Sequence, residues 1–564
     1  MTKVLSVFMA LVMAFTSLAI VATAADNDLG VIVASDIHLS KRAFAKYTGN
    51  TAKDPYAHVP VSGQLPYESN AIATAFFEKA AASDSDIVLL SGDLTDQGRE
   101  EEHIAFTKTL ADFEAKSGKQ VYVIPGNHDL FNVTPEHFTE LYADFGYSEA
   151  IVIDDNSISY TADLDNGYRL LAIDSTLPGE SATGVTAERV KWIEAQCKKA
   201  AEDGKKVIAT MHHNLLQHVI FGTLILPTGI VDESLGLAEV LAANGVQYIF
   251  TGHTHDHDIA SYTATNGKVI YDVVTNTLNA YPVAYRSVKF GQDVVFKTEY
   301  VDKIDTSLLP EGLSDEAVAL AEENFTEYTK KCIWIGLTDL FNTYLSPSYL
   351  KRLAKIDAKE NPEMAAIFDK TVTKLCEGLR FPIYKADETE DGVSLEAMIN
   401  ANGKTLPASE YTDLFNLAIT FYQAHCLGDE NFPVYSKEVD ILTKGLTAVL
   451  NYTLADLTAE EFVVALSYVC TLFGADVPAW LLNFAGSGLS RFDSIYEILM
   501  LAVTPLITEF SVDSAPADNN VVLPGYASPV VTTPAGLFDW LKNLFNQIEI
   551  FVKSILEYVE KLFK

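Results

Sequence analysis

Five short apolar segments of this chain end in residue types that bind metals, and this pattern constrains the fold more than any other feature. The segments read VIVASDIH, IVLLSGD, VYVIPGNHD, KVIATMHH and VQYIFTGHTH. Each is rich in β-branched, aromatic or other large apolar residues, as buried strands are. Because ligands gather at the carboxyl ends of strands in α/β sheets, the sequence predicts that these five ends converge on one site.

The spacing inside these segments supports a metal site. Asp36 and His38 are two residues apart, and so are His253 and His255. Near a strand end, this spacing predicts that both side chains of a pair lie on one face and grip one ion. A glycine precedes the candidate ligands in GD, GNHD and GHTH, where it lets the backbone bend sharply. One such fragment is common by chance, whereas five in order indicate a built site.

The rest of the chain divides by pattern. At 564 residues it is too long for one ordinary core. Strand-like and helical segments alternate over residues 28–305, which predicts an α/β domain. Three-to-four spacing of apolar residues over 310–512 predicts an all-helical domain, and the Pro-, Ala- and Val-rich stretch 513–534 predicts a linker. Residues 535–564 carry one apolar stripe and predict an amphipathic C-terminal helix.

Residues 1–24 are predicted to be a signal peptide. Lys3 gives a small positive start, an apolar run follows from Val4 to Val21, and Ala22-Thr23-Ala24 fits an A-x-A cleavage site. An uncleaved anchor is the alternative, since the run approaches the roughly 20 residues that span a bilayer. The small residues at its end favour cleavage, so the mature protein is predicted to be secreted or to lie at the cell surface.

Charge and cysteine content exclude some classes of protein. With 40 basic and 76 acidic residues the net charge is −36, which repels polyanions, so no long nucleic acid is expected as a partner. The five cysteines are widely separated and include no C-x-x-C pair. We expect most of them to fill apolar space, and the sequence assigns no disulfide.

The five segments resemble the motifs of the calcineurin-like metallophosphoesterase family over roughly residues 29–300, with no motif missing. The resemblance implies an α/β fold in which two β-sheets flanked by helices form a four-layer αββα sandwich with a dinuclear metal centre. It implies that one metal is held by Asp36, His38 and His255, and the other by Asn127, His212 and His253, with Asp93 bridging the two.

The ligand types suit particular ions and a particular reaction. Imidazole together with oxygen donors suits Mn, Fe, Zn or Ni, and the sequence does not choose among them. Two such cations acidify a bridging water into hydroxide and stabilise in-line displacement at phosphorus. No nucleophile from the protein is then required.

Four further residues receive predicted roles. His128 is predicted to donate a hydrogen bond or proton to the phosphate or the leaving oxygen. Asp129 is predicted to orient His128, with a helix N-cap as the equally weighted alternative. His213 and Arg286 are predicted to contact substrate. Either His212 or His213 could in principle bind the metal; the family pattern favours His212, so a place behind the ligands is the alternative for His213. For Arg286 the alternative is a surface salt bridge.

Two insertions and the C-terminal helix leave alternatives open. Residues 41–69 and the apolar stretch 215–231 are predicted to select the substrate, and the alternative for the second is packing under the helical domain. The helix at 535–564 is predicted to dock on the protein or on a partner. Its balanced charge, four Lys against one Asp and three Glu, disfavours a membrane surface.

Together these features predict a secreted hydrolase that cleaves a small phosphodiester or phosphomonoester of nucleotide or lipid head-group type. The preference for a diester rests on family analogy. A catalytically silent cell-envelope binding protein is one alternative, which the intact ligand set disfavours. A metal-dependent nuclease is another, which the charge of −36 disfavours.

Overall fold

The computed structural model describes residues 28–526 with gaps, of which the main ones are 178–183, 219–228, 354–361, 385–392, 462–499 and 508–515. The predicted signal peptide and the predicted C-terminal helix lie outside the described residues. So do Cys470 and most of the apolar insertion 215–231. The other four cysteines are free thiols, and all four are buried.

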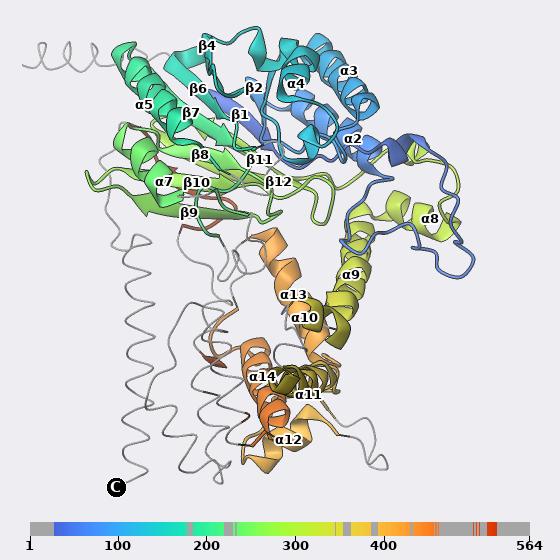
Figure 1. Ribbon diagram of the computed structural model, residues 1–564. Coiled ribbons are helices and arrows are strands. Elements are labelled where there is room, and N and C mark those ends of the chain that lie inside the picture. The colour runs from blue at the N-terminus through green and yellow to red at the C-terminus, as the bar shows by residue number, and fades with distance from the viewer. Residues whose placement is uncertain are drawn as a thin grey trace, which may run out of the picture.

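The strands before residue 301, together with one strand near residue 523, form two mixed β-sheets (Figure 1). The first sheet has the order β13-β12-β11-β1-β2-β3 and the second β4-β5-β6-β7-β8-β10-β9. The strands of the first are β1 (Leu29–Ala34), β2 (Ile87–Leu90), β3 (Gln120–Val123), β11 (Ala284–Phe290), β12 (Asp293–Tyr300) and β13 (Val522–Pro524). Those of the second are β4 (Val152–Ile153), β5 (Tyr160–Asp163), β6 (Tyr168–Ile173), β7 (Lys206–Met211), β8 (Tyr248–Thr251), β9 (Asp258–Thr263) and β10 (Val269–Val274).

The two sheets pack face to face and carry helices on their outer faces (Figure 1). Side chains alternate along the central strands: Tyr248 and Phe250 of β8 join the core between the sheets, whereas Ile249 joins a second core beneath the outer helices. Both faces of the strand are therefore buried, which explains why its sequence reads as a continuous apolar run. The predicted sandwich of two sheets flanked by helices is confirmed.

The helices around the sheets cover both sides of the sandwich. Helices α2 (Ser69–Ala82), α3 (Glu100–Ser117) and α4 (Pro135–Leu141) accompany the first sheet, and α5 (Ala187–Glu202) and α7 (Ser234–Ala243) the second (Figure 1). Short turns of other helix types are η1 (Lys41–Phe44), η2 (His128–Leu130), η3 (Ala143–Tyr147), η4 (Asp165–Gly167) and η5 (Thr306–Leu308).

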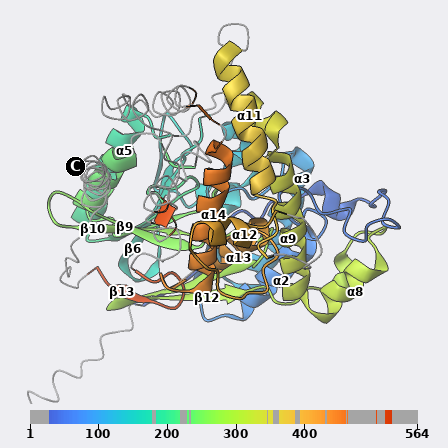
Figure 2. The same ribbon diagram turned by 90° about the horizontal axis from the view of Figure 1, so that it is seen from below.

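Residues beyond the sandwich form helices, as predicted for the C-terminal half. They are α8 (Asp315–Glu323), α9 (Phe325–Tyr344), α10 (Pro347–Leu353), α11 (Pro362–Gly378), α12 (Leu395–Ala401), α13 (Leu414–Leu427) and α14 (Lys437–Leu454). Hydroxyl or carboxylate side chains of Ser314, Asp413 and Ser436 cap the starts of α8, α13 and α14. Figure 2 shows this helical region from below. Among the described residues no helix is both long and apolar enough to cross a membrane.

Residues 516–526, which we call the return segment, correct the prediction of a linker over 513–534. Its strand β13 pairs antiparallel with β12, with Leu523 opposite Val294. The hydroxyl of Tyr526 donates to the carbonyl of Val207 at 2.5 Å, and that of Tyr248 donates to the carbonyl of Pro524 at 2.6 Å. Composition missed this strand because a three-residue edge strand is specified by its partners and not by its own propensity.

The first insertion, residues 41–69, packs along the helical region (Figure 1). The backbone amide of Tyr47 donates to the carbonyl of Glu311 at 2.8 Å, and the hydroxyl of Ser314 donates to the carbonyl of Pro55 at 2.9 Å. Buried His58 lies 2.9 Å from the Tyr328 hydroxyl and 3.3 Å from the Glu68 carboxylate. Much of this insertion therefore joins the sandwich to α8 and α9.

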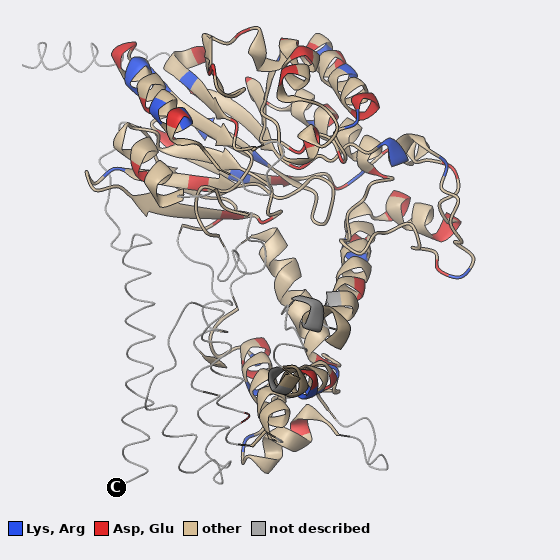
Figure 3. Cartoon of the chain, viewed as in Figure 1, with Lys and Arg blue, Asp and Glu red and all other residues tan. Residues whose placement is uncertain are grey.

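Charged side chains are interspersed over the chain. In the view of Figure 3, Asp and Glu lie beside Lys and Arg along α3 and α5, and no continuous basic stripe follows the described elements.

Candidate metal centre

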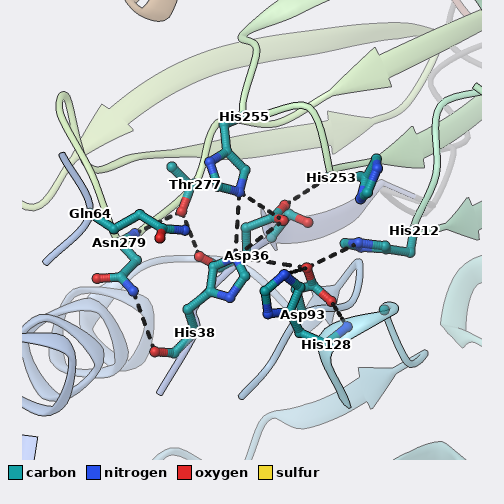
Figure 4. A network of polar contacts seen from close by, with 12 residues as sticks. Asp36, His38, Gln64, Asp93, His128, His212, His253, His255, Thr277 and Asn279 are labelled. Carbon is teal, nitrogen blue, oxygen red and sulfur yellow. Dashed lines mark hydrogen bonds and ion pairs between the residues drawn. The ribbon is translucent and has the colours of Figure 1, made fainter. Parts of the chain in front are cut away.

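The predicted ligands converge at the seam between the two sheets. Parallel strands β1, β2 and β3 of the first sheet end at one edge, and parallel strands β7 and β8 of the second end beside it. The segments after these five strands carry every predicted ligand. Figure 4 labels these ligands apart from Asn127. The five strand ends therefore meet at one site, but this site lies between two sheets and not at the edge of a single sheet.

The first group consists of Asp36, His38 and His255. Nε2 of His255 lies 3.3 Å from Oδ1 of Asp36 and 3.4 Å from Nε2 of His38. Nε2 of His38 lies 3.7 Å from the same Asp36 oxygen. One potential ligand atom from each residue lies within 4.8 Å of the others, so the three can hold one cation.

Asp93 lies between this group and the second. Its Oδ2 is 3.7 Å from Nε2 of His38 and 3.3 Å from Nε2 of His212. The ring of His212 lies 5.1 Å from that of His253, centroid to centroid. Asn127 follows Gly126 in the turn after β3, and the backbone amide of the next residue, His128, donates to Oδ1 of Asp93 at 2.8 Å. Asp93 is thus placed to bridge two ions, as the family resemblance implies.

Unpaired polar atoms show that the site fits metal ions. Within the described residues, buried Oδ1 of Asp36, Oδ1 of Asn127, Nε2 of His212 and Nε2 of His253 have no hydrogen-bond partner. A buried polar atom without a partner costs about 1–3 kcal/mol. These four atoms are among those that the predicted coordination would use, and nitrogen with oxygen donors suits divalent transition metals.

The backbone at the ligands is held in an uncommon conformation. In the described part of the chain, five of the seven non-glycine residues with positive φ are predicted ligands, namely Asp36, His38, Asp93, His253 and His255, with φ between 46° and 69°. Such conformations cost on the order of 1–3 kcal/mol each and cluster at functional sites. They also correct our spacing argument: β1 ends at Ala34, so a left-handed backbone, and not strand alternation, turns Asp36 and His38 inward.

Two glycines allow the loops to approach each other closely. A Cβ atom at Gly126 would lie 2.1 Å from Oδ1 of Asp93, and one at Gly252 would lie 2.4 Å from Oδ2 of Asp36. Neither carboxylate could keep its place beside a larger residue. These positions explain why glycine precedes the ligands in GNHD and GHTH.

Hydrogen bonds fix the orientation of the ligands. Nδ1–H of His212 donates to the carbonyl of Ser91 at 2.9 Å, which leaves Nε2 as the ligand atom. The backbone amide of His253 donates to Oδ2 of Asp36 at 2.9 Å. The Thr277 hydroxyl donates to the carbonyl of Asp36 at 2.7 Å, and Nδ2 of Asn279 to that of His38 at 3.3 Å (Figure 4).

Electrostatics favour charged carboxylates and a neutral His253. Burial opposes ionisation of Asp36, but the His255 and His38 side chains outweigh it and hold its pKa well below the usual value. Burial also opposes protonation of His212, yet Asp93 raises its pKa to about 9, so a bound cation must displace that proton. Burial and neighbouring His212 lower the pKa of His253 to about 3, which leaves its ring free to bind a metal.

His128 lies beside Asp93, and its side chain is partly exposed. Its Nδ1 is 2.6 Å from the carbonyl of Asp96, and because a carbonyl only accepts, Nδ1 carries a proton. Its Nε2 lies 4.0 Å from Oδ2 of Asp93, and 29% of the side chain is exposed. The position permits contact with a bound phosphate, and the catalytic role itself stays a prediction.

Asp129 does not orient His128 and does not cap a helix, so both interpretations of this residue are wrong. Its buried carboxylate accepts hydrogen bonds from the amides of Leu94, Thr95 and Gly126 at 2.9–3.1 Å, and from the Thr95 hydroxyl at 2.8 Å. Burial and then nearby Asp93 raise its pKa. Asp129 ties the loop of Asp93 to the loop of Asn127 from behind.

The two predicted substrate contacts differ in outcome. His213 is buried beside His212 and His253, with Nδ1 2.8 Å from the Ser175 hydroxyl and Nε2 without a partner, so its contact with substrate stays a prediction. The prediction for Arg286 is wrong. Its buried guanidinium donates to the carbonyls of Val274, at 2.9 Å, and Asp518, and it is neither a phosphate ligand nor part of a surface salt bridge.

Ser91, Asn276, Thr277 and Asn279 support the ligands, and sequence reasoning gave none of them a role at the metals. Ser91 is bonded through its backbone carbonyl, which every residue type possesses. The other three follow β10 and reach the centre only because β10 lies next to β8. No local pattern could have identified them.

Comparison with known proteins agrees with this geometry. Residues 29–257 match the family model described as calcineurin-like phosphoesterase, so this part of the chain is a domain of that family. A probable glycerophosphodiester phosphodiesterase GpdQ of Arcobacter nitrofigilis is 29% identical over 28% of this chain and 54% of its own length. A glycerophosphodiester phosphodiesterase GpdQ of Enterobacter lignolyticus is 30% identical over 31% of this chain and 58% of its own.

A probable cyclic nucleotide phosphodiesterase of Rhodococcus erythropolis is 27% identical over 35% of this chain and 59% of its own length. The chain therefore spans a little over half the length of these curated relatives. Among solved structures, a dimetal phosphatase from Danio rerio covers 48% of this chain and 96% of its own at 13% identity, with a TM-score of 0.37.

Proposed function

We propose that this protein is a two-metal phosphoesterase that hydrolyses a small phosphodiester. The observation that carries the proposal is the set of buried, unpartnered ligand atoms of Asp36, Asn127, His212 and His253 around a bridging Asp93. Two of these residues, Asp36 and His253, also have strained backbone, and unsatisfied polar atoms with strained backbone are typical of a built functional site.

The chain's own residues divide the work of this reaction. Asp36, His38 and His255 would hold one ion, and Asn127, His212 and His253 the other, with Asp93 between them. Bound metals would polarise the phosphoryl oxygens and supply a water nucleophile of low pKa. The proton on Nδ1 of His128 is donated to the backbone carbonyl of Asp96. Nε2 can therefore donate to the leaving-group oxygen only when it carries a second proton.

The preference for a diester rests on the relatives. Three curated proteins that share the domain are named as phosphodiesterases of glycerophosphodiesters or cyclic nucleotides. Both substrates are small and carry one anionic phosphodiester. We extend that class to this chain, and leave the alcohol groups of the ester open.

We also propose that the protein acts outside the cytoplasm. The support is the basic residue, apolar run and A-x-A site within residues 1–24. Mass spectrometry of the N-terminus after expression in a secreting host tests this. A mature chain that begins at Ala25 supports export with cleavage, and a chain that retains Met1 in the cytosolic fraction contradicts it.

The first test of the activity compares hydrolysis of bis-p-nitrophenyl phosphate and p-nitrophenyl phosphate with added Mn, Zn or Fe. We expect metal-dependent turnover that is faster on the diester, and a loss of at least about 10³-fold in Asp93→Ala. His137, which is partly exposed, pairs with Glu140 on α4, so His137→Ala serves as the matched control and should retain full activity. Two bound ions per chain without turnover of either ester would contradict the proposal.

A further inference from the structure

The end of helix α13 lies against the loop that follows the last predicted ligand. Nε2 of His425 lies 2.9 Å from Oδ1 of Asp256, the residue directly after His255. Only 12% and 13% of these two side chains are exposed, so the pair is largely shielded from water. A segment more than 150 positions away in sequence therefore fixes the backbone next to a ligand.

Asn276 continues this connection into the ligand itself. The side chain is fully buried, and its Nδ2 donates to the carbonyl of His255 at 2.7 Å and to the carbonyl of Cys426 at 3.2 Å. Its backbone amide donates to Nδ1 of His257 at 3.3 Å. One amide group thus joins the peptide of a predicted ligand to the end of α13.

The return segment closes the other side of the same loop. The carboxylate of Asp518 accepts from the amide of Ile259 at 2.8 Å, and Nδ2 of Asn519 donates to the carbonyl of Leu427 at 2.9 Å. Gly428 has φ of +69°, and a Cβ there would lie 2.8 Å from the carbonyl of His257 and 3.0 Å from Asp518. Residues 255–259 are therefore enclosed between two segments from the C-terminal half.

Apolar side chains also pack between the sandwich and the helical region. Tyr281, in the loop before β11, packs in one buried cluster with Ile333 and Leu337 of α9 and Ile419 and Cys426 of α13. The views of Figures 1 and 2 show α9 and α13 together beneath the sandwich. Both helices are thus anchored to the strand connection that carries Asn276, Thr277 and Asn279.

We propose that the helical region holds one ligand of the metal centre in place, and that Asn276 and His425 are positioning residues for His255. Because His255 has φ of +61°, its ring stays at the centre only while its peptide is held from outside. The site with Asp36 and His38 depends on this contact, whereas the site with Asn127 and His212 does not. This inference rests on the proposed two-metal function.

The test measures Mn²⁺ affinity of the full chain by equilibrium dialysis with elemental analysis, in two single-site backgrounds. Asn127→Ala leaves the ion held by His255, and His255→Ala leaves the ion held by His212. In the first background we expect Asn276→Ala to weaken Mn²⁺ binding 10- to 100-fold, as the loss of a group that orients a ligand does. In the second we expect a change below about threefold.

Two controls separate positioning from a general loss of structure. Asn244 also donates its Nδ2 to a backbone carbonyl, that of Val240, at 2.8 Å, so Asn244→Ala should leave both affinities unchanged. His425→Leu should weaken binding in the first background, and His425→Gln, which keeps an N–H donor for Asp256, should restore at least half of the loss in log affinity.

Equal loss in both backgrounds, or no loss in either, would overturn the inference. A parent chain that binds no Mn²⁺ and no Zn²⁺ would instead overturn the proposed function, so the two failures are distinguishable. If Asn276 had only a structural role, Asn276→Ala would lower the unfolding midpoint and would change the Mn²⁺ affinity equally in the two backgrounds.

Discussion

Asp129 holds two ligand loops together and is predicted here to act on the structure of the site and not in the reaction itself. Its carboxylate accepts four hydrogen bonds from two loops, and Asn at this position keeps one oxygen but places an NH₂ group against N–H donors. We expect Asp129→Asn to lower the free energy of unfolding by about 2–3 kcal/mol. Urea denaturation at fixed metal concentration measures it.

The same variant should also lose turnover, because the loops of Asp93 and Asn127 would separate. The loss should shrink when metal is added in excess, since the defect is in the placement of ligands. A variant with parental stability and no recovery at any metal concentration would show that Asp129 acts directly in the reaction.

His218 gives a prediction about pH. Its Nδ1 lies 2.5 Å from Oδ2 of Asp258 and its Nε2 3.1 Å from Oδ2 of Asp272. Burial opposes protonation, but the two carboxylates, Asp272 foremost, raise the pKa to about 10. Because this folded-state pKa exceeds the usual value near 6.5, the charged ring stabilises the fold below pH 6.5, and the contribution is lost as pH rises through about 10.

The expected result is a stability gap between the parent and His218→Gln that narrows with pH. At pH 7 the gap should be on the order of 3 kcal/mol, since the variant leaves two buried carboxylates without their cation, and above pH 10 it should nearly vanish. Guanidinium denaturation of both chains from pH 6 to 10.5 measures it. A gap that stays constant over that range would show that His218 is neutral in the folded protein.

At this scale, the sequence predicted residues that belong to contiguous motifs. Asp36, Asn127 and His253 each come shortly after a buried strand, so the apolar run before each of them shows where the ligand lies. The role of Arg286 could not be predicted, because its partners Val274 and Asp518 are defined only by the packed fold. The left-handed backbone at the non-glycine ligands could not be predicted from the sequence either, because the surrounding structure imposes it.

The return segment was predicted to be a linker, but it forms a strand and buried hydrogen bonds. Asp518 accepts the amide hydrogen of Ile259, and its carbonyl accepts from Arg286, so Asp518→Ala leaves a buried amide without a partner. We expect a loss of about 1–3 kcal/mol in the free energy of unfolding. Exposed Asn520 lies two residues further along, so Asn520→Ala is the matched control. Differential scanning calorimetry of the two variants tests whether the effect belongs to residue 518 or to the segment as a whole.

Elements with strong internal patterns were predicted well, and those defined by pairing were not. The runs that became β1, β2, β3, β7 and β8 are apolar because both of their faces are covered, and they were recognised for that reason. Strand β13 has three residues and pairs with β12 across more than 200 positions. Likewise the insertion 41–69 was assigned to substrate selection from its place beside a motif, while its Tyr, Pro and Gly residues gave no sign that it packs on α8 and α9.

The charge of the whole molecule bears on the choice of substrate. The net charge is −36, and a bis-p-nitrophenyl phosphate anion approaches it against a repulsive field. Raising the ionic strength from 0.01 to 0.15 M shortens the Debye length from about 30 to about 8 Å. We expect kcat/KM for this anion to rise roughly two- to fivefold over that range, because screening removes repulsion before the substrate reaches the metals.

A zwitterionic diester such as glycerophosphocholine provides the matched control, since it carries no net charge and its kcat/KM should change little. The comparison between the two substrates removes any effect of salt on the enzyme itself. If kcat/KM for the anion fell with salt while that of the zwitterion held constant, a local positive field from the bound cations would dominate the −36 of the chain. In that case the charge argument against polyanionic substrates would lose its basis, and short oligonucleotides would become the next substrates to assay.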